Sequence, residues 1–298
     1  MKRILITGKG SYIGVALEKR LKQEENKYLI DTLDLESMEW DQHDFSGYDV
    51  VLHVAGIVHV SSDPKLKDLY YRVNRDLAVE VARRAKNARI LQFIFLSSVS
   101  VYQNNTRENG RISFTTIPEP ANFYGDSKLQ AERGISLLET EDFAVTILRL
   151  PMVYGYGSKG NYPKLAKMAV TLPFFPEYKN CRSIIHIDNL TELIKLIIDD
   201  ASRGVFYPQN KEHVSTGELA QLIAQVHGKR LVLTKLFNPL IFLLMKFFPF
   251  IKKVFGDLYY EDSMSAYPGG NYQIRTLPES IHLTEIGSSE DQIFAAKK

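Results

Sequence analysis

The first 34 residues combine a glycine-rich turn with two short apolar segments, and this combination restricts the fold more than any other feature of the chain. Residues 2–7 predict a short buried strand, and residues 8–14 (Gly-Lys-Gly-Ser-Tyr-Ile-Gly) predict a tight turn that enters a helix. A second strand is expected over Tyr28–Leu33, and Asp34 follows it, twenty residues after Gly14. This spacing predicts a strand–helix–strand unit of the kind that binds dinucleotides.

Each part of this unit has a physical role in holding a nucleotide. Glycines allow the backbone to turn sharply and approach a pyrophosphate, while the helix amino terminus offers free N–H groups. We therefore expect the following turn residues to bind the cofactor: Gly8, Gly10, Ser11, Tyr12 and Ile13.

The cofactor is expected to be NAD. The carboxylate of Asp34 would accept hydrogen bonds from the adenosine ribose and would repel a 2′-phosphate, which disfavours NADP. Asp31 is an alternative acid, but it falls inside the expected strand.

Composition limits the classes of protein to consider. The chain has 298 residues, enough for one large α/β domain or a main domain with a smaller lobe. Its net charge of +2 gives no indication of a nucleic-acid partner. Cys181 is the single cysteine, which fits a reducing compartment, and residues 1–7 are too short to hold the apolar core of a signal peptide. We expect a cytoplasmic protein.

Strands and helices are expected to alternate through the first half of the chain. Strands are predicted over Val50–Val54, Leu91–Ser97 and Ala144–Leu150, and helices over Lys67–Ala85 and Tyr124–Glu139. This alternation predicts an α/β fold with a doubly wound parallel sheet, the Rossmann arrangement.

Beyond residue 154 the alternation weakens, which predicts a smaller substrate lobe. A strand at Ser183–Ile187 and a helix at Asn189–Ile198 are expected, and Ser215–Val226 predicts an amphipathic helix with Ser215 or Thr216 as its N-cap. We expect residues 1–154 and about 183–210 to form the NAD-binding domain. Residues of about 155–182 and 211–298 would form the C-terminal lobe.

Residues 236–255 are strongly apolar, but Pro239, Lys246 and Pro249 interrupt them. No run approaches the roughly 20 apolar residues that a membrane-spanning helix needs. One interpretation is a pair of short helices packed inside the lobe. The alternative is a peripheral membrane contact, with lysines 235, 246, 252 and 253 near lipid headgroups, and a third is an interface with another protein.

Three residues are expected to carry chemistry. Tyr124 and Lys128 are four residues apart on a predicted helix and therefore share one face. The ammonium group of Lys128 can lower the pKa of the phenol, so that Tyr124 exchanges a proton with a sugar hydroxyl during hydride transfer. Ser98 follows the central strand, where doubly wound folds bind ligands. Either motif alone also occurs by chance.

On these motifs, the chain resembles the extended short-chain dehydrogenases/reductases, within the sugar-nucleotide epimerase/dehydratase family, and it is most similar to polysaccharide-pathway members. The resemblance covers roughly residues 2–200 and implies that Ser98, Tyr124 and Lys128 form the catalytic triad. Tyr124 would be the acid/base, Lys128 would hold the nicotinamide ribose, and Ser98 would orient the substrate hydroxyl. Further cofactor contacts are implied at Asp44, Phe45, Val54, Ala55, Gly56, Leu96, Ser97 and Pro151.

The resemblance also implies that Arg182 binds the diphosphate of the substrate, since a guanidinium offers a planar fork of donors to phosphate. A surface ion pair is an alternative role for this arginine, and a solvated turn is an alternative for Asp44–Phe45.

The chain departs from the family pattern at several positions. Ser11 replaces the usual middle glycine of the turn, and Gln103 replaces a glycine that commonly follows Val-Tyr. Met152 stands where hexose 4-epimerases usually have asparagine. Ser98-Val99-Ser100 replaces the Thr-Asp-Glu triplet of 4,6-dehydratases, which argues against dehydration.

The first functional hypothesis is an NAD-dependent nucleotide-sugar 4-epimerase acting by transient oxidation at C4. The second is an NAD(P)H-dependent 4-keto-deoxysugar nucleotide reductase, and the third is a non-catalytic nucleotide-binding protein. The carrier of the sugar is UDP or a polyprenyl diphosphate. We expect a homodimer, and no metal site is expected because no His, Cys, Asp or Glu cluster has suitable spacing.

Overall fold

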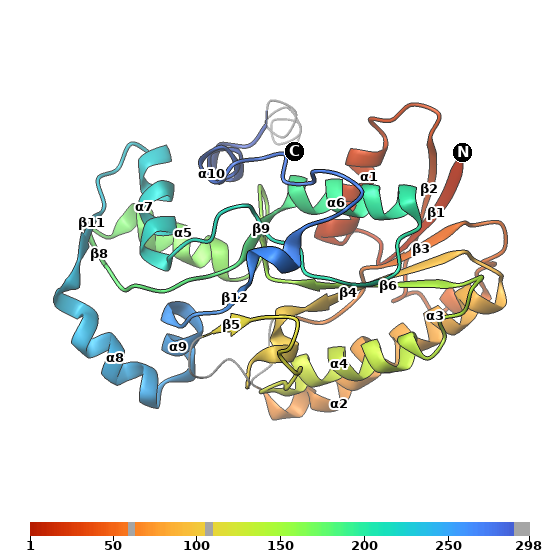
Figure 1. Cartoon of the computed structure of the whole chain (residues 1–298), viewed down its shortest axis with the longest axis horizontal. Helices are drawn as coiled ribbons and strands as arrows, with labels where there is room; N and C mark the ends of the chain where they lie inside the picture. The colour runs from red at the N-terminus through yellow and green to blue at the C-terminus, as the bar shows by residue number, and fades with distance from the viewer. Residues whose placement is uncertain (59–62, 105–109, 289–298) are drawn as a thin grey trace.

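The computed structural model describes residues 1–58, 63–104 and 110–288. Its centre is a six-stranded sheet in which every pair of neighbours is parallel, with the strand order β10-β6-β4-β3-β1-β2 (Figure 1). The strands are β1 (Lys2–Thr7), β2 (Tyr28–Leu33), β3 (Val50–His53), β4 (Gln92–Ser98), β6 (Ala144–Leu150) and β10 (Gly204–Phe206). The predicted fold class is confirmed.

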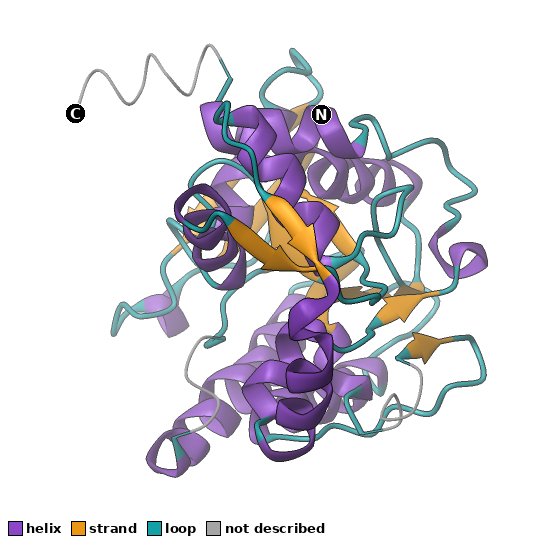
Figure 2. Ribbon diagram, turned by 90° about the vertical axis from the view of Figure 1, so that its left-hand side faces the viewer, coloured by secondary structure: helices purple, strands orange, loops and turns teal. Residues whose placement is uncertain are grey.

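Helices cover both faces of this sheet (Figure 2). Because successive strand residues point to opposite faces, Ile4 and Ile6 enter one core while Leu5 enters the other. The first core includes residues of α1 (Tyr12–Leu21) and α6 (Ile187–Asp200). The second includes residues of α3 (Ala78–Asn87) and α4 (Phe123–Ser136).

The strand order reverses at β1, which lies between β2 and β3. Hydrogen bonds join these strands at their carboxyl ends. The Val54 N–H donates to the Thr7 carbonyl at 3.0 Å, and the Gly8 N–H donates to the Leu33 carbonyl at 2.9 Å. Ligands of open α/β sheets bind outside the carboxyl ends of the strands at such a reversal. The glycine turn and the Val54–Gly56 segment therefore border the expected binding crevice.

The predicted helix over Lys67–Ala85 is present but is not uniform. It consists of α2 (Lys67–Tyr70), a π-helical stretch η3 (Tyr71–Leu77) and then α3. The buried Asn74 lies in the π-helical stretch. Apolar periodicity alone does not distinguish a π-helical turn from an α-helical one, and such turns often occur at functional sites.

After β6 the chain leaves the main sheet. Pro151, which has no N–H to donate, separates β6 from β7 (Met152–Tyr154), and β7 pairs with β9 (Ile184–His186) in a small separate sheet. The expected strand near Ser183–Ile187 is thus present, but the sixth strand of the main sheet is β10, which was not predicted.

The lobe has its own apolar core, which includes Tyr154, Phe175, Ile223 and Ile281. Ser215 forms a capping box with Glu218 and begins the predicted amphipathic helix as its N-cap. The elements around this core are α5 (Asn161–Thr171), β8 (Phe174–Pro176), α7 (Thr216–Val226), β11 (Val232–Thr234), α8 (Asn238–Phe247), α9 (Pro249–Phe255) and α10 (Leu277–Ile286).

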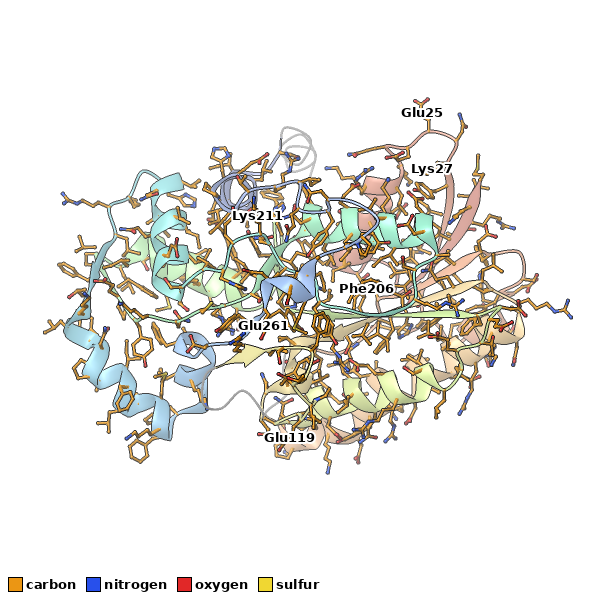
Figure 3. The ribbon with its side chains drawn as sticks, viewed as in Figure 1. Glu25, Lys27, Glu119, Phe206, Lys211 and Glu261 are labelled. Carbon is orange, nitrogen blue, oxygen red and sulfur yellow. The ribbon has the colours of Figure 1, made fainter. Side chains whose placement is uncertain are left out.

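Short elements connect the lobe to the sheet. The strands β5 (Arg111–Ile112) and β12 (Tyr259–Tyr260) pair in parallel, and Glu261, labelled in Figure 3, forms an ion pair with Arg111 at 2.8 Å. The 3₁₀ helices are η1 (Trp40–Gln42), η2 (Pro64–Leu66), η4 (Val99–Tyr102), η5 (Lys235–Phe237) and η6 (Asp262–Ser265).

The apolar segment 236–255 forms two short helices, α8 and α9, as one interpretation predicted. Its packing inside the lobe is only partial, because Ile241 and Phe255 are buried whereas Leu236 and Phe247 are exposed. The side chain of Lys253 lies outside the described part of the structure. Among the described residues, no helix has the length and apolarity to cross a membrane.

Candidate active site

Tyr124 lies in the first turn of α4, directly beside the carboxyl end of β4. Asn122 caps the helix by accepting a hydrogen bond from the Gly125 N–H at 3.0 Å. The helix start lies so close to η4 that a Cβ atom on Gly125 would be 2.5 Å from the Ser100 carbonyl oxygen. This close approach packs the start of α4 against η4, which directly follows Ser98 at the end of β4.

Lys128 lies one turn further along α4 and is buried, with a 4% exposed side chain. Its ammonium group donates to the Leu96 carbonyl at 2.9 Å and lies 4.7 Å from the centroid of the Phe95 ring. A Cβ atom on Gly56 would be 3.1 Å from Nζ, so Lys128 also borders the segment that follows β3. Burial lowers the pKa of Lys128 to about 8, although the nearby Glu132 carboxylate acts in the opposite direction.

The expected lowering of the Tyr124 pKa is not present in the ligand-free structure. Burial raises the pKa of Tyr124, and the hydrogen bond with Ser98 lowers it only in part. The ammonium group of Lys128 contacts the Leu96 carbonyl instead of the phenol, so desolvation is the largest effect on the phenol.

A buried ionic network behind the triad was not anticipated from the sequence. Arg149 donates to the Glu132 carboxylate, with Nη2 at 2.6 Å and Nε at 3.1 Å. Ser97 also donates to Glu132, and Arg149 Nη1 donates to the hydroxyl of Tyr102. The spacing could have indicated Glu132, because it lies four residues after Lys128 on the same helix face.

Asn74 is a second residue whose role the sequence did not indicate. Its side-chain oxygen accepts from the Ile57 N–H at 2.8 Å, and its nitrogen donates to the Ile57 carbonyl at 3.0 Å. The same nitrogen lies 3.4 Å from the Ser127 hydroxyl. Asn74 therefore holds the predicted cofactor segment Val54–Gly56 against α4.

The glycine turn has a backbone conformation that requires glycine at one position and is open at another. Gly8 has φ +112°, and a Cβ atom there would be 2.9 Å from the Ala55 nitrogen, so only glycine fits without movement. No described atom lies within 4 Å of the Cβ position of Gly10, which leaves the turn open on that side.

The residues after Gly10 form the start of α1. Ser11 is its N-cap and accepts from the Gly14 N–H at 3.3 Å, so the serine replaces the usual glycine without disrupting the helix start. Tyr12 and Ile13 are the first two residues of the helix, and Ile13 packs against the sheet core. The N–H groups of Gly8 and Lys9 both donate to the Leu33 carbonyl, so the binding of a dinucleotide phosphate at this turn stays a prediction.

Asp34 and Asp31 occupy different environments. Asp34 directly follows β2, is exposed, and accepts a hydrogen bond from the Glu36 N–H at 2.9 Å. The carboxylate of Asp31 accepts from the hydroxyl of Tyr48 at 3.0 Å and lies 3.9 Å from Arg3. Of the two acids, Asp34 lies at the end of the strand, where a ribose would be bound.

Asp44 and Phe45 have structural roles of their own. The Asp44 carboxylate accepts from the backbone N–H and the hydroxyl of Ser46, at 2.8 and 2.7 Å, and these bonds lower its pKa. Phe45 is buried in the core beneath α3. The role of this pair beside the adenine stays a prediction, as do the cofactor contacts of Leu96, Ser97 and Pro151, three buried residues at the ends of β4 and β6.

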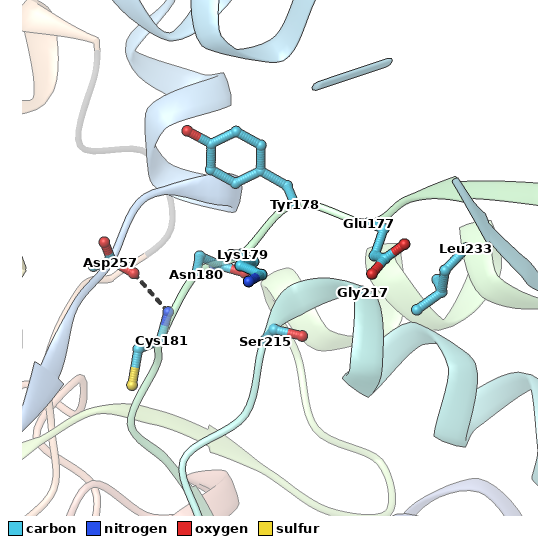
Figure 4. Close-up of a pocket in the computed structure, with 9 residues that line it drawn as sticks. All are labelled: Glu177, Tyr178, Lys179, Asn180, Cys181, Ser215, Gly217, Leu233 and Asp257. Atoms are coloured by element: carbon cyan, nitrogen blue, oxygen red, sulfur yellow. Dashed lines mark hydrogen bonds between the residues drawn. The ribbon is translucent and has the colours of Figure 1, made fainter. Parts of the chain in front are cut away.

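Arg182 lies near the lobe, two residues before β9. Its Nη1 donates to the Gly256 carbonyl at 2.9 Å, and burial lowers its pKa against the effect of Asp257. Beside it is a pocket of about 500 Å³ whose lining includes Tyr178, Cys181, Ser215 and Asp257 (Figure 4). The Cys181 N–H donates to Asp257 at 2.6 Å across one side of this pocket.

A doubly wound sheet with a glycine turn after its first strand, and a Tyr–Lys pair on a helix beside β4, is typical of the class of short-chain dehydrogenases/reductases. The sequence model of the NAD dependent epimerase/dehydratase family matches residues 4–207, and the chain belongs to this family. The family resemblance predicted from the motifs is confirmed.

Individual relatives include sugar-nucleotide enzymes. The chain is 29% identical to a UDP-glucose 4-epimerase of Vibrio cholerae over 246 residues, which cover 75% of each chain. Its structure is similar to that of a dTDP-4-dehydrorhamnose reductase of Clostridium acetobutylicum, with a TM-score of 0.74, 18% identity, and coverage of 99% of this chain and 100% of the other. It is also similar to a UDP-glucuronic acid 4-epimerase of Bacillus cereus in complex with NAD, with a TM-score of 0.74, 17% identity, and coverage of 96% and 98%.

Within residues 1–58, 63–104 and 110–288, no group of three or more His, Cys, Asp or Glu residues is placed to hold a metal ion.

Proposed function

We propose that the chain is an NAD-dependent nucleotide-sugar 4-epimerase that acts by transient oxidation at C4. The observation that carries this proposal is the placement of Tyr124 and the buried Lys128 one turn apart on α4, which packs against β4, the strand that ends at Ser98. Lys128 also borders Gly56, in the segment that follows β3, and Ala55 of the same segment lies against Gly8 of the glycine turn. The relation to the Vibrio cholerae 4-epimerase supports the same activity.

NAD fits the nucleotide side of this site. Gly8, Gly10 and Ser11 would hold its pyrophosphate, Asp34 its adenosine ribose, and Lys128 its nicotinamide ribose. When bound, NAD supplies the acceptor and later the donor of the hydride that C4 of the sugar must lose and regain.

The chain's own residues manage the proton at the C4 hydroxyl. Tyr124 Oη accepts this proton as C4 is oxidised and returns it after the keto sugar has turned its other face. Ser98 donates a hydrogen bond to the same oxygen and keeps it beside the phenol. Because burial raises the pKa of Tyr124 in the ligand-free protein, its pKa must fall when the site fills, and Lys128 is the cation on the same helix face.

A 4-keto-deoxysugar nucleotide reductase is the second candidate. The dTDP-4-dehydrorhamnose reductase of Clostridium acetobutylicum has a similar fold over nearly the whole chain. Met152, in place of the asparagine of hexose 4-epimerases, favours this candidate as well. A reductase would use the same triad but would consume external NADH or NADPH.

The proposal extends to the carrier, the assembly and the location. We propose UDP as the carrier, with a polyprenyl diphosphate as the alternative, and Arg182 as the residue that binds the diphosphate. The proposed assembly is a homodimer in the cytoplasm, with peripheral membrane contact through residues 236–255.

Two measurements test the activity. In the first, the purified protein is denatured and the supernatant is assayed for nucleotide. In the second, the native protein is incubated with UDP-hexoses and UDP-N-acetylhexosamines without added cofactor. Stoichiometric NAD⁺ and inversion at C4, detected by proton NMR, are expected. A protein that is purified empty and oxidises NADPH with 4-keto sugars would replace the epimerase with the reductase.

A further inference from the structure

The outer side of α8 carries a stripe of exposed apolar side chains. Leu240, Leu243 and Phe247 follow one another at intervals of three and four residues, which places them on one face of α8, and Leu236 precedes them in the 3₁₀ helix η5. Their exposed fractions are 79, 53, 51 and 70%. We call these four residues the outer stripe.

The outer stripe is part of a well-packed element. On the opposite side of α8, Ile241 is buried and Met245 packs against the lobe core. The following helix, α9, ends at the buried Phe255, whose ring lies 6.1 Å from that of Phe175. Figure 1 places the α8–α9 hairpin at the end of the molecule far from β1 and β2, and Figure 3 shows side chains projecting outward from α8. The inner face thus fixes the hairpin while the stripe points to the outside.

The charged residues within the segment that carries the stripe are all positive. Residues 235–256 contain four lysines and no acidic residue. Lys246 is exposed on α8, and its ammonium group lies 4.9 Å from the centroid of the Phe242 ring, which is itself 56% exposed. Lys235, at the beginning of the stripe, lies 3.8 Å from Glu177. Lysines beside exposed leucine and phenylalanine side chains are typical of helices that lie in the interface of an anionic bilayer.

We propose that the α8–α9 hairpin docks on an anionic lipid surface, with the outer stripe inserted among the acyl chains and the lysines at the headgroups. A ten-residue helix is about 15 Å long, so α8 would lie in the plane of the membrane and not across it. A second copy is a poorer occupant, because two such hairpins would bring their lysines together and residues 235–256 hold no acidic residue to pair with them.

The docking surface is connected to the proposed substrate site, and this part of the inference rests on the proposed function of Arg182. The carbonyl of Gly256, which follows α9, accepts the hydrogen bond of Arg182 at 2.9 Å, and the next residue, Asp257, accepts from the Cys181 N–H. A docked hairpin would therefore hold the loop that carries Arg182 near the headgroup layer.

The full-length protein is sedimented with vesicles of phosphatidylcholine alone and with vesicles that also contain phosphatidylglycerol. Binding is expected with the anionic vesicles, and it should weaken in high salt. The variant Leu243→Asp/Phe247→Asp should bind at least tenfold more weakly, since both changes place a carboxylate in the stripe. The control is Leu137→Asp, an exposed leucine at the end of α4, which should bind like the wild type.

Two further measurements separate membrane docking from the epimerase proposal and from misfolding of the variant. Turnover of a soluble UDP-sugar by the stripe variant should match the wild type, so a failure of the epimerase proposal would not alter the vesicle result. Thermal unfolding confirms that the variant is folded. The inference is overturned if anionic vesicles do not retain the protein, or if they retain the folded stripe variant equally well. It is also overturned if light scattering shows that the stripe variant loses a dimer, because the stripe would then cover a second copy.

Discussion

At the scale of single residues, burying the charged ammonium group of Lys128 lowers the stability of the folded protein. It is enclosed by the Leu96 carbonyl, the Phe95 ring and the backbone of Gly56, and burial lowers its pKa to about 8. A lysine in the unfolded chain has a pKa near 10.5, so the folded protein opposes protonation of this group. The proposed role beside a nicotinamide ribose explains why a buried cation is present here.

The variant Lys128→Met should therefore be more stable than the wild type at pH 7, by about 1–3 kcal/mol after the lost hydrogen bond is included. Because the unfolded chain binds the proton more tightly, wild-type stability rises with pH between about 8 and 10.5 relative to a neutral variant. The difference in stability between Lys128→Met and the wild type should therefore become smaller from about pH 8 to pH 10.5. Urea unfolding of both proteins at pH 7 and pH 10 measures it, and a variant that is less stable at pH 7 would contradict the assigned cost.

At the scale of elements, α4 organises the site because its buried face presents Tyr124, Lys128 and Glu132 at intervals of four residues. Glu132 pairs with Arg149 at the end of β6, and the Arg149 carbonyl accepts from the Tyr260 hydroxyl at 2.8 Å. The pair thus links the catalytic helix to the main sheet and to β12 of the lobe.

Replacing one partner of this pair should be more harmful than replacing both. Glu132→Leu leaves a buried guanidinium without its carboxylate and should lower stability by about 3–5 kcal/mol. Adding Arg149→Met to that variant should recover a large part of the loss, since no buried charge then remains. Chemical denaturation of the two variants tests this, and a double variant less stable than the single one would show that Arg149 has other essential partners.

The elements differ in how far the sequence determined them. β1, β2 and β6 begin and end where they were predicted. For β1 and β6 the reason is that buried parallel strands are apolar runs bounded by turns, whereas β2 is a partly exposed strand at the sheet edge. The separate pairing of β7 with β9 depends on contacts between distant residues, which no local pattern encodes. The π-helical stretch at Tyr71–Leu77 was missed for the same reason, and the raised pKa of Tyr124 reflects burial that spacing alone does not reveal.

The exposure of the outer stripe could not be predicted from the sequence either. An apolar residue such as Leu243 has the same identity whether it faces a core or the solvent, so the sequence left both interpretations of residues 236–255 open. Only the packing of Ile241 against the lobe determines which side of α8 is free.

At the scale of the whole molecule, the proposed cofactor would join segments that are far apart in the chain. The glycine turn follows β1, the Val54–Gly56 segment follows β3, and Lys128 lies on α4. A ligand that contacts all three segments stabilises the folded state. At ligand concentrations well above the dissociation constant, this stabilisation grows with the logarithm of the ligand concentration.

Adding NAD⁺ to protein stripped of nucleotide should therefore raise its Tm. In Gly8→Ala this increase should be absent, because a Cβ atom would press on the Ala55 nitrogen and φ +112° is unfavourable for alanine. Gly10→Ala is the matched comparison, with a positive φ but open space around it, and it should lose less of the stability of the free protein. Differential scanning fluorimetry measures both effects, and an undiminished increase in Gly8→Ala would exclude the turn as the pyrophosphate site.

The most direct test of the account is the turnover of Tyr124→Phe, which removes a single oxygen atom from the site. The substrate is the UDP-sugar that the wild type epimerises, and no cofactor is added. Loss of general acid–base catalysis should reduce kcat by about 10²–10⁴-fold while bound NAD⁺ is retained. A Tyr124→Phe protein with bound NAD⁺ and undiminished inversion at C4 would contradict the central claim that this phenol moves the proton.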